Sequence, residues 1–302
     1  MLLNTFIASA ILALTHTTLA SPLNATHNDL RNSSLVERKE NAPVPRVHYL
    51  NSNEIDAFRM VKVPPARPWQ PRSRIGSMSG EDDRIEWDTF EYPYSSIGRL
   101  EIRSKTRGNV WSVCSGSLVG PRHVITARHC VHRADHDSIT RVTFAPNFFN
   151  GERLGHSFVT DVIIPDSIEG GGTCYETNDW AVLILADRIG DKHGYLGAKE
   201  IDCSTQEDVP MFTHVGYPND HGTKTPFRQD RISIFDCHKC GKGSVRSDAD
   251  VIKGQSGGPL FKMEDGLAWQ YGHLSAAYPS NVGFMSGSDF VKVIAKARKD
   301  YL

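Results

Sequence analysis

The sequence has 302 residues, of which 39% are hydrophobic and 23% are charged. This composition is typical of a globular protein with enough apolar material for a sizeable core, and the length suggests about two domain-sized units. The 34 basic and 35 acidic residues nearly cancel, which gives a formal net charge of -1. This balance argues against nucleic acid or an anionic membrane surface as a partner.

The first 20 residues have the pattern of a secretory signal peptide. An apolar run extends from Leu2 to Leu14, and small residues close the segment at Thr18–Ala20. The alternatives are a buried core helix or a membrane anchor, but the run is too short and too interrupted by polar residues to span a bilayer. We therefore predict a secreted, extracellular protein, with glycosylation sequons at Asn24 and Asn32.

Residues 21–74 are predicted to form a disordered or loosely folded propeptide. The segment is rich in Asn, Pro, Arg and Ser and shows no sustained strand or helix periodicity. A flexible arm that stays attached to the folded part is the alternative. The predicted processing site is the bond Arg74–Ile75, which leaves residues 75–302 as the mature domain.

From about Glu91 the sequence consists of short β-prone runs separated by Gly, Asn and Asp, which favours a sandwich or barrels. The predicted strands are Ile97–Ile102, Val110–Leu118, His123–Ala127, Arg141–Phe144, Ser157–Ile164, Trp180–Leu185, Met211–Gly216, Ile232–Phe235, Gly258–Phe261, Trp269–His273 and Val282–Met285. One helix is predicted at the end of the chain, where Ser288 and Asp289 precede an amphipathic run. The fold class is therefore all-β with a C-terminal helix.

The segment from Gly254 to Leu260 is the strongest candidate for a nucleophile turn. It places Ser256 between glycines and ends in Pro259 and an apolar residue. Small neighbours allow the backbone to approach a substrate closely and to direct two N–H groups at one point. The same letters also occur in ordinary loops, so a catalytic role requires matching His and Asp residues.

The candidate general base is His129, at the end of a β-prone strand that follows a Gly-Pro turn. Cys130 follows it directly, and Cys114 lies 16 positions earlier. A disulfide between these cysteines would close the hairpin and fix the turn that carries the imidazole.

The candidate partner of His129 is Asp179, which immediately precedes a strongly apolar strand. A carboxylate beside the imidazole Nδ1 would set its tautomer, and hydrogen bonds would have to satisfy its burial. Three other aspartates, Asp161, Asp166 and Asp187, are rivals within or around polar loop edges. Asp179 is preferred because a buried strand follows it.

Taken together, the motifs CSGSLVGPRHVITARHC, NDWAVLIL and GQSGGPLF, in the order His, Asp, Ser, resemble the chymotrypsin-like serine peptidases. Residues 75–84, Tyr92–Gly98, Gly216–Pro218 and Gln255 are more similar to the glutamyl-endopeptidase branch. The resemblance covers about residues 75–302. It implies two antiparallel six-stranded β-barrels with the active site between them.

The resemblance also implies roles for individual residues. Ser256 would be the nucleophile, His129 the general base and Asp179 its orienting partner, with the N–H groups of Gly254 and Ser256 as the oxyanion hole. One departure is Gln255, because trypsin-type enzymes have at this position an Asp that pairs with the new N-terminal amine.

Substrate preference is the less specific part of the resemblance. His273 matches a His that receives the substrate carboxylate in the glutamyl branch, which predicts cleavage after Glu or Asp. Against this, Val251 stands where that branch has Ser or Thr. Asp250, six residues before Ser256, would favour Lys or Arg in a trypsin-like pocket. A plain core histidine is the alternative for His273.

The other four cysteines, Cys174, Cys203, Cys237 and Cys240, allow three pairings. We favour Cys174–Cys203 and Cys237–Cys240. The CxxC spacing of Cys237 and Cys240 could also suggest a redox or zinc site, but no second CxxC at zinc spacing is present. A secreted chain favours disulfides, and we predict no metal and no cofactor.

The sequence thus predicts a secreted serine endopeptidase made as a zymogen, monomeric, acting on proteins or peptides through an acyl-enzyme. The alternatives are an inactive peptidase fold that binds a partner, or an esterase with the same triad. The esterase is disfavoured because α/β-hydrolases place Ser before Asp and His in the chain.

Overall fold

The computed structural model describes residues 42–59, 62–66, 82–104, 112–132, 139–166, 174, 177–237, 243–278 and 281–302. Two units divide the chain, Met1–Ala42 and Pro43–Leu302, and all described residues except Ala42 lie in the second. The predicted signal peptide, Asn24 and Asn32 therefore lie outside the described residues. Among the described residues, no helix is both long and apolar enough to cross a membrane.

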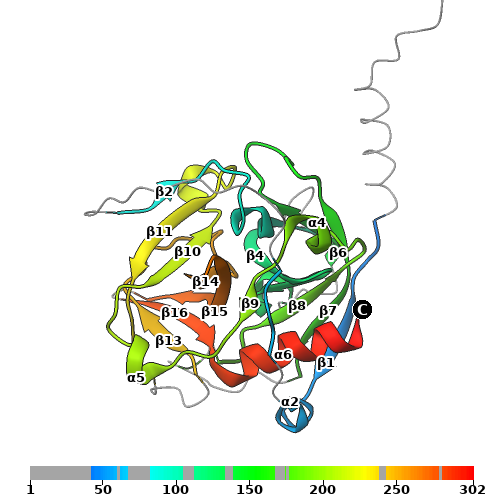
Figure 1. Ribbon diagram of the computed structural model, residues 1–302. Helices are drawn as coiled ribbons and strands as arrows, with labels where there is room; N and C mark the ends of the chain where they lie inside the picture. The colour runs from blue at the N-terminus through cyan, green and yellow to red at the C-terminus, as the bar shows by residue number, and fades with distance from the viewer. Residues whose placement is uncertain are drawn as a thin grey trace, which may run out of the picture. The chain divides into compact units, whose positions relative to one another are not determined.

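Six antiparallel strands close into the first barrel, which occupies one half of the second unit (Figure 1). They are β3 (Ile97–Ser104), β4 (Ser112–Gly120), β5 (His123–Thr126), β6 (Ile139–Pro146), β7 (Ser157–Pro165) and β8 (Ala181–Leu185). The ring runs β7-β6-β3-β4-β5-β8 and returns to β7.

The alternation of side chains along β3 shows why these residues form a barrel wall. Leu100 and Ile102 are fully buried in the barrel core. Between them, Glu101 faces outward and pairs with Arg99 and Arg103, at 3.4 and 2.6 Å. Successive residues of a strand point to opposite faces, so this pattern fixes which face is the core.

The second sheet contains nine strands and forms a half-barrel. Its path is β12 (Ile234–Phe235), β13 (Val245–Ser247), β16 (Val282–Ser286), β15 (Leu267–Ala277), β14 (Pro259–Glu264), β10 (Phe212–Gly216), β11 (Phe227–Ile232) and β2 (Ile85–Glu86), with β9 (Gly197–Ala198) beside β15. No pairing among the described residues joins its two-residue ends, β12 and β2. The second barrel is therefore open, unlike the closed six-stranded barrel that the resemblance implies.

Helices are few and short, apart from one at the C-terminus. The short ones are α3 (Arg128–Val131), α4 (Gly190–His193), α5 (Cys203–Gln206), η1 (Tyr94–Ser96) and η4 (Asn219–His221). The C-terminal helix α6 (Gly287–Asp300) buries Phe290 and Ile294 against Trp180 and Met285. The predicted all-β class and C-terminal helix are confirmed.

Each predicted strand overlaps an observed strand, but the sequence pattern does not predict β1, β2, β9 or β13, and it includes only the last residue of β11, Ile232. The strand β1 (Arg46–Leu50) and the helix α2 (Ser52–Ala57) lie within the segment interpreted as disordered or loosely folded. Strand β1 pairs in parallel with β7, and α2 has a capping box formed by Asn51 and Glu54. The interpretation is therefore wrong for this part of residues 21–74.

Two disulfides join described cysteines, and one of them differs from the predicted pairing. Cys114–Cys130 forms as predicted, with the Cα atoms 6.2 Å apart. Cys203 pairs with Cys237, with a Cα distance of 6.0 Å, so both favoured pairings are wrong. Cys174 is also disulfide-bonded, and Cys240 lies outside the described residues.

The fold explains the pairing of Cys203 with Cys237. A parallel bridge joins Glu207 to Ile234, and the Asp208 N–H donates to the Ile234 carbonyl at 2.8 Å. The Cys237 N–H donates to the Glu207 carboxylate at 3.1 Å. These contacts bring the residues after α5 beside the residues after β12, which spacing along the chain does not reveal.

A non-reducing digest should yield a peptide pair that links Cys203 to Cys237. Replacing both residues by Ser should lower the free energy of unfolding by about 3–4 kcal/mol on the chain-entropy model, because the two cysteines lie 34 positions apart. Mass spectrometry of the digest and urea unfolding are the measurements. The peptides containing Cys114 and Cys130 provide an internal control, and a Cys174–Cys203 linkage would contradict the structure.

Candidate active site

The buried carboxylate of Asp179 holds His129 by two bonds. Its Oδ1 accepts the His129 backbone N–H at 2.9 Å, and its Oδ2 lies 2.8 Å from Nδ1 of the ring. The Asp179 side chain is fully buried, whereas the His129 side chain is 27% exposed. The bond to Nδ1 fixes the ring orientation and leaves Nε2 as the free edge of the imidazole.

A third donor to Asp179 comes from the second sheet. Ser275 on β15 donates its hydroxyl to Asp179 Oδ2 at 2.5 Å. Three donors compensate for the removal of this carboxylate from water. The sequence alone does not reveal Ser275, because nothing in its local pattern distinguishes it from other strand serines.

Ser256 lies on a tight turn packed against β4. Its carbonyl accepts the Ser115 N–H at 2.8 Å, and Cys130 Sγ lies 3.8 Å from the same oxygen. Since Cys130 follows His129 in the chain, these contacts bring the serine turn beside α3. Among the described residues no hydrogen bond joins His129 Nε2 to Ser256 Oγ, a bond that often tightens only when substrate is bound.

Glycine is required on both sides of Ser256. Gly254 and Gly257 have φ angles of +98° and +82°, which favour residues without a side chain. A Cβ at Gly257 would lie 2.0 Å from Thr126 Oγ1, and a Cβ at Gly254 would lie 2.3 Å from the Tyr217 carbonyl oxygen. The turn can therefore pack this closely only because these positions are glycines.

The backbone before Ser256 is held from two directions. The Lys253 carbonyl accepts the Asn219 N–H at 2.8 Å, and the Gly254 carbonyl accepts the Ser115 hydroxyl at 2.9 Å. In a trans peptide the N–H points away from the carbonyl, so the Gly254 N–H points away from Asn219. Within the described chain, no hydrogen bond uses the N–H groups of Gly254 and Ser256, which leaves both as donors for a ligand.

Cys114, His129 and Cys130 form a cluster in which one atom of each residue lies within 4.8 Å of the others. Such a group could resemble a metal site by geometry alone. The two sulfur atoms are joined in a disulfide, however, and cysteine binds metals as the thiolate. The cluster therefore ties α3 to β4 and offers no thiolate ligand.

His273 lies in the protein interior, beside Asp179. Its Nε2 is 2.9 Å from the Asp179 backbone carbonyl, and its ring packs against Phe290 of α6. Burial lowers the pKa of His273 to about 4, against the smaller opposing effect of the Asp179 carbonyl. The ring is thus neutral at neutral pH and donates from Nε2.

Val251, another predicted pocket residue, lies in a different part of the structure from His273. Leu274 points to the opposite strand face from His273 and packs in one cluster with Val251. The Leu274 backbone bonds to Gly257 and Gly258, beside Ser256. Leu274 and Val251 therefore belong to the same apolar cluster of the second sheet, whereas His273 lies on the other face of β15.

Asp250 is bound by Gln229 and lies close to a second acidic group. The Gln229 amide donates to the Asp250 carboxylate at 3.3 Å and accepts the Asp250 N–H at 2.7 Å. Burial raises the pKa of Asp83, and the charge of Asp250 raises it further. Asp83 and Asp250 therefore lie close enough for their charges to interact.

Residues 91–294 match the family model described as Trypsin. The chain belongs to the trypsin family. A glutamyl endopeptidase from Bacillus licheniformis is 29% identical over 242 residues, which is 79% of this chain and 70% of the relative. An extracellular metalloprotease from Bacillus subtilis is 27% identical over 195 residues, or 64% of this chain and 58% of the relative.

Among solved structures, a Glu endopeptidase in complex with MPD superposes with a TM-score of 0.59 at 22% sequence identity. The superposition covers 73% of this chain and 98% of that structure. At this identity it supports the fold alone. With the family match, this trypsin-family chain is a serine endopeptidase of the chymotrypsin-like fold, near the glutamyl-endopeptidase branch.

The stability of this trypsin-family protein should fall as the pH is lowered from about 6.5 towards 4. Burial lowers the pKa of His123, His214 and His273 to about 4 each. Below pH 6.5 or so the unfolded chain therefore binds protons that the folded chain does not. Thermal unfolding of the Ser256→Ala protein between pH 7 and 4 measures this effect.

The contribution of His273 can be isolated with a variant that keeps a hydrogen-bond donor. His273→Gln should show a smaller drop in melting temperature over this pH range than its parent. The exposed His221→Gln is the matched control and should behave like the parent. Equal drops in all three proteins would contradict the neutral state of His273.

Proposed function

We propose that Ser256, His129 and Asp179 form the catalytic triad of this endopeptidase. The observation that carries the proposal is the double contact of the buried Asp179 carboxylate with the His129 backbone and Nδ1. This arrangement orients Nε2 and stabilises the imidazolium that forms during the reaction. The N–H groups of Gly254 and Ser256 are the proposed oxyanion hole.

The reaction follows from these positions. Ser256 Oγ attacks the substrate carbonyl while His129 Nε2 takes the hydroxyl proton, and the two N–H groups bind the resulting oxyanion. His129 then gives the proton to the leaving amine, which leaves an acyl-enzyme on Ser256. Water attacks the ester by the same route, and the acid product leaves with Ser256 regenerated.

The same proposal includes secretion of the enzyme as a monomeric zymogen. All five described cysteines are disulfide-bonded, which supports an oxidising compartment. Processing is proposed at Arg74–Ile75. Gln255 cannot form the ion pair by which a trypsin-type Asp receives the new amine, because its side chain is neutral.

For substrate preference, we propose cleavage after Glu or Asp, supported by the similarity to a relative named as a glutamyl endopeptidase. His273 is not a direct partner for the substrate carboxylate in this proposal, since it bonds to the Asp179 carbonyl. A preference for Lys or Arg is the second candidate. It rests on the position of Asp250, six residues before Ser256.

Digestion of a denatured test protein tests both parts of the proposal. Replacing Ser256 by Ala should lower kcat by about 10⁶-fold, since the nucleophile is lost. Mass spectrometry of the new termini should find cuts after Glu or Asp with the parent enzyme and none with the variant.

Each other result of the digest has a defined meaning. Cuts after Lys or Arg that disappear in the Ser256→Ala variant would retain the triad and reassign the preference to Asp250. Cuts that persist in this variant would overturn the triad. A correctly processed protein that makes no cuts would support the inactive binding protein instead.

A further inference from the structure

Described residues 43–59 and 62–66, here called the strap, lie within the predicted propeptide but pack into the peptidase fold. The first contact closes a gap in the first barrel. Strand β6 pairs with β7 only at Ser157 and Phe158. Strand β1 continues along β7 from Asp161 to Pro165, and β8 pairs with β7 from Val159 to Ile163. Without the strap, the backbone groups at the end of β7 would be exposed on one edge.

An ion-pair cluster joins the strap to the same strand. The Asp161 side chain is 4% exposed and accepts Arg46 Nε at 2.8 Å and Arg46 Nη2 at 3.0 Å. His48 Nε2 lies 2.8 Å from the same carboxylate. Both partners belong to the strap, so its departure would remove bound donors from a buried carboxylate, which is strongly unfavourable.

Apolar side chains of the strap belong to the main core. Leu50, Ile55 and Val63 are 6%, 6% and 1% exposed and share one cluster with Trp180 and Phe290. In Figure 1, β1 and α2 (blue) lie beside β7 and α6 (red). Further along the strap, backbone bonds join Val63 to Ala198 and Ala66 to Tyr195, at 2.8–3.0 Å.

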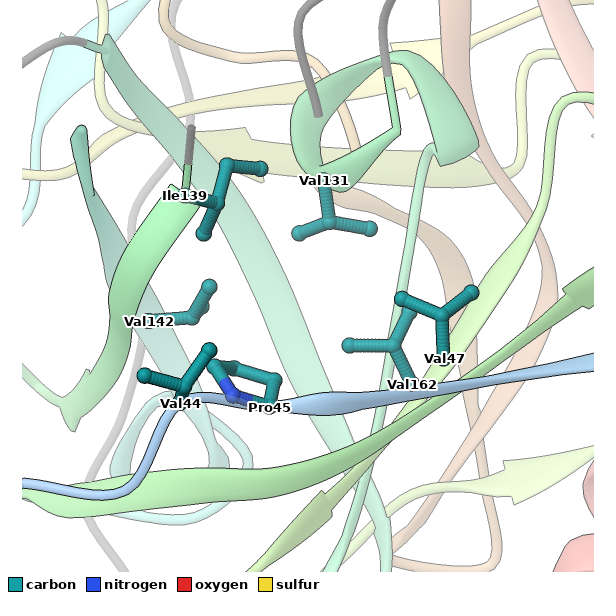
Figure 2. A pocket seen from close by; sticks show the side chains of 7 residues that line it. All are labelled: Val44, Pro45, Val47, Val131, Ile139, Val142 and Val162. Carbon is teal, nitrogen blue, oxygen red and sulfur yellow. The ribbon is translucent and has the colours of Figure 1, made fainter. Parts of the chain in front are cut away.

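The other face of β1 forms one wall of a cavity of about 250 Å³. Figure 2 shows the strap residues Val44, Pro45 and Val47 lining the cavity with Val131, Ile139, Val142 and Val162, and Val47 lies beside Val162, its partner in the β1–β7 pairing. Val131 belongs to α3, the helix that carries His129. The strap therefore covers apolar surface on the barrel and on the far side of the helix that holds the imidazole.

From these contacts we propose that the strap stays bound in the mature enzyme as a second, non-covalently held chain. Hydrolysis of Arg74–Ile75 adds water across one bond and leaves a carboxylate on Arg74 and an amine on Ile75. This cut breaks none of the contacts described above, and none of those contacts is with Ser256, His129 or Asp179. The binding partner of the strap is thus the mature domain of the same chain, residues 75–302, here called the body.

The test uses the full-length Ser256→Ala protein, which cannot cleave itself. An orthogonal protease site placed around Arg74 allows a single cut, followed by gel filtration and mass spectrometry. The strap fragment should elute with the body under native conditions and apart from it in concentrated urea. Leu50→Ala should release a larger fraction of fragment than the exposed Asn53→Ala control.

Separation of the strap under native conditions, with an unchanged circular dichroism spectrum of the body, would overturn the proposal. If Leu50→Ala does not fold, hydrogen exchange of the uncut Ser256→Ala protein gives the answer. The β1 amides that bond to β7 should exchange as slowly as the β7 amides, and fast exchange confined to β1 would also overturn the proposal. The proposal rests on the proposed processing at Arg74–Ile75, but neither readout requires catalysis, so failure of the triad would change neither result.

A separate network points to a positioning role for Arg84. Its side chain is 8% exposed and donates to Asp220 at 2.7 Å and to Asp82 at 2.8 and 2.7 Å. Its Nη1 also donates to Gln255 Oε1 at 3.3 Å. Gln255 is 1% exposed and precedes Ser256, while Asp220 follows Asn219, whose N–H holds the Lys253 carbonyl.

We infer that Arg84 holds the loop before Ser256 in the shape that aims the Gly254 and Ser256 N–H groups at the substrate. In this chain a side-chain cation beside Gln255 would do what an N-terminal amine does beside Asp in trypsin-type enzymes. The inference rests on the proposed function, because it concerns the same oxyanion hole.

Kinetics of Arg84→Gln test this role. We expect kcat to fall by about 10- to 100-fold, less than the loss of a whole oxyanion donor, with little change in KM. Arg84→Lys should recover part of the loss. Arg153→Gln is the matched control, because Arg153 also pairs with an exposed carboxylate, that of Asp88.

An unchanged kcat in Arg84→Gln would overturn the positioning role. A fall in kcat in the control Arg153→Gln as large as that in Arg84→Gln would also overturn it. If Arg84→Gln does not fold, Asp220→Asn should show the same loss of kcat. The two hypotheses can fail separately. If Ser256→Ala loses activity while Arg84→Gln keeps full activity, the triad is retained and the positioning role of Arg84 is rejected.

Discussion

The carboxylate of Asp179 is the interaction on which the arrangement of the molecule depends. It precedes a strand of the first barrel, orients His129 on α3, and accepts the hydroxyl of Ser275 from the second sheet. One buried charge thus requires donors from both halves of the fold. Because an unpaired buried charge is so unfavourable, this group fixes the two sheets relative to one another as well as the imidazole.

Close backbone packing also holds the first barrel against the second sheet. The turn at Gly257 contacts Thr126 and Ser115 of the first barrel, at distances that leave no space for a side chain. The Ser115 backbone and hydroxyl bond to the carbonyls of Ser256 and Gly254. The serine turn belongs to the second sheet by sequence, but its shape is determined largely by the first barrel.

Much of this organisation could be predicted from the sequence, because it depends on local pattern. Alternating apolar residues predict the strands, and the positions of His129 and Asp179 beside apolar strands make them candidate partners, whose side chains lie 2.8 Å apart in the structure. His273 is different. Strand alternation alone shows that His273 and Leu274 face opposite sides, but which side faces Val251 depends on the packing of β15.

Several of the features that the sequence does not predict are long-range. Strand β1 pairs with β7 across more than a hundred residues, and the two prolines before it, Pro43 and Pro45, weaken its strand signal. The Cys203–Cys237 pairing depends on a bridge between Glu207 and Ile234. Arg84 bonds to Asp82 locally, but it reaches Asp220 and Gln255 only when η4 and the loop before Ser256 come together. Such contacts have no periodic signature, since tertiary packing creates them.

The disulfide Cys114–Cys130 also has a consequence for handling the enzyme. Helix α3 has four residues, far fewer than a helix needs to be stable by itself. In a reducing buffer this turn would lose its covalent tether to β4. Thiol additives, or expression in a reducing cytosol, would therefore loosen the turn that carries the imidazole and lower the specific activity of the enzyme.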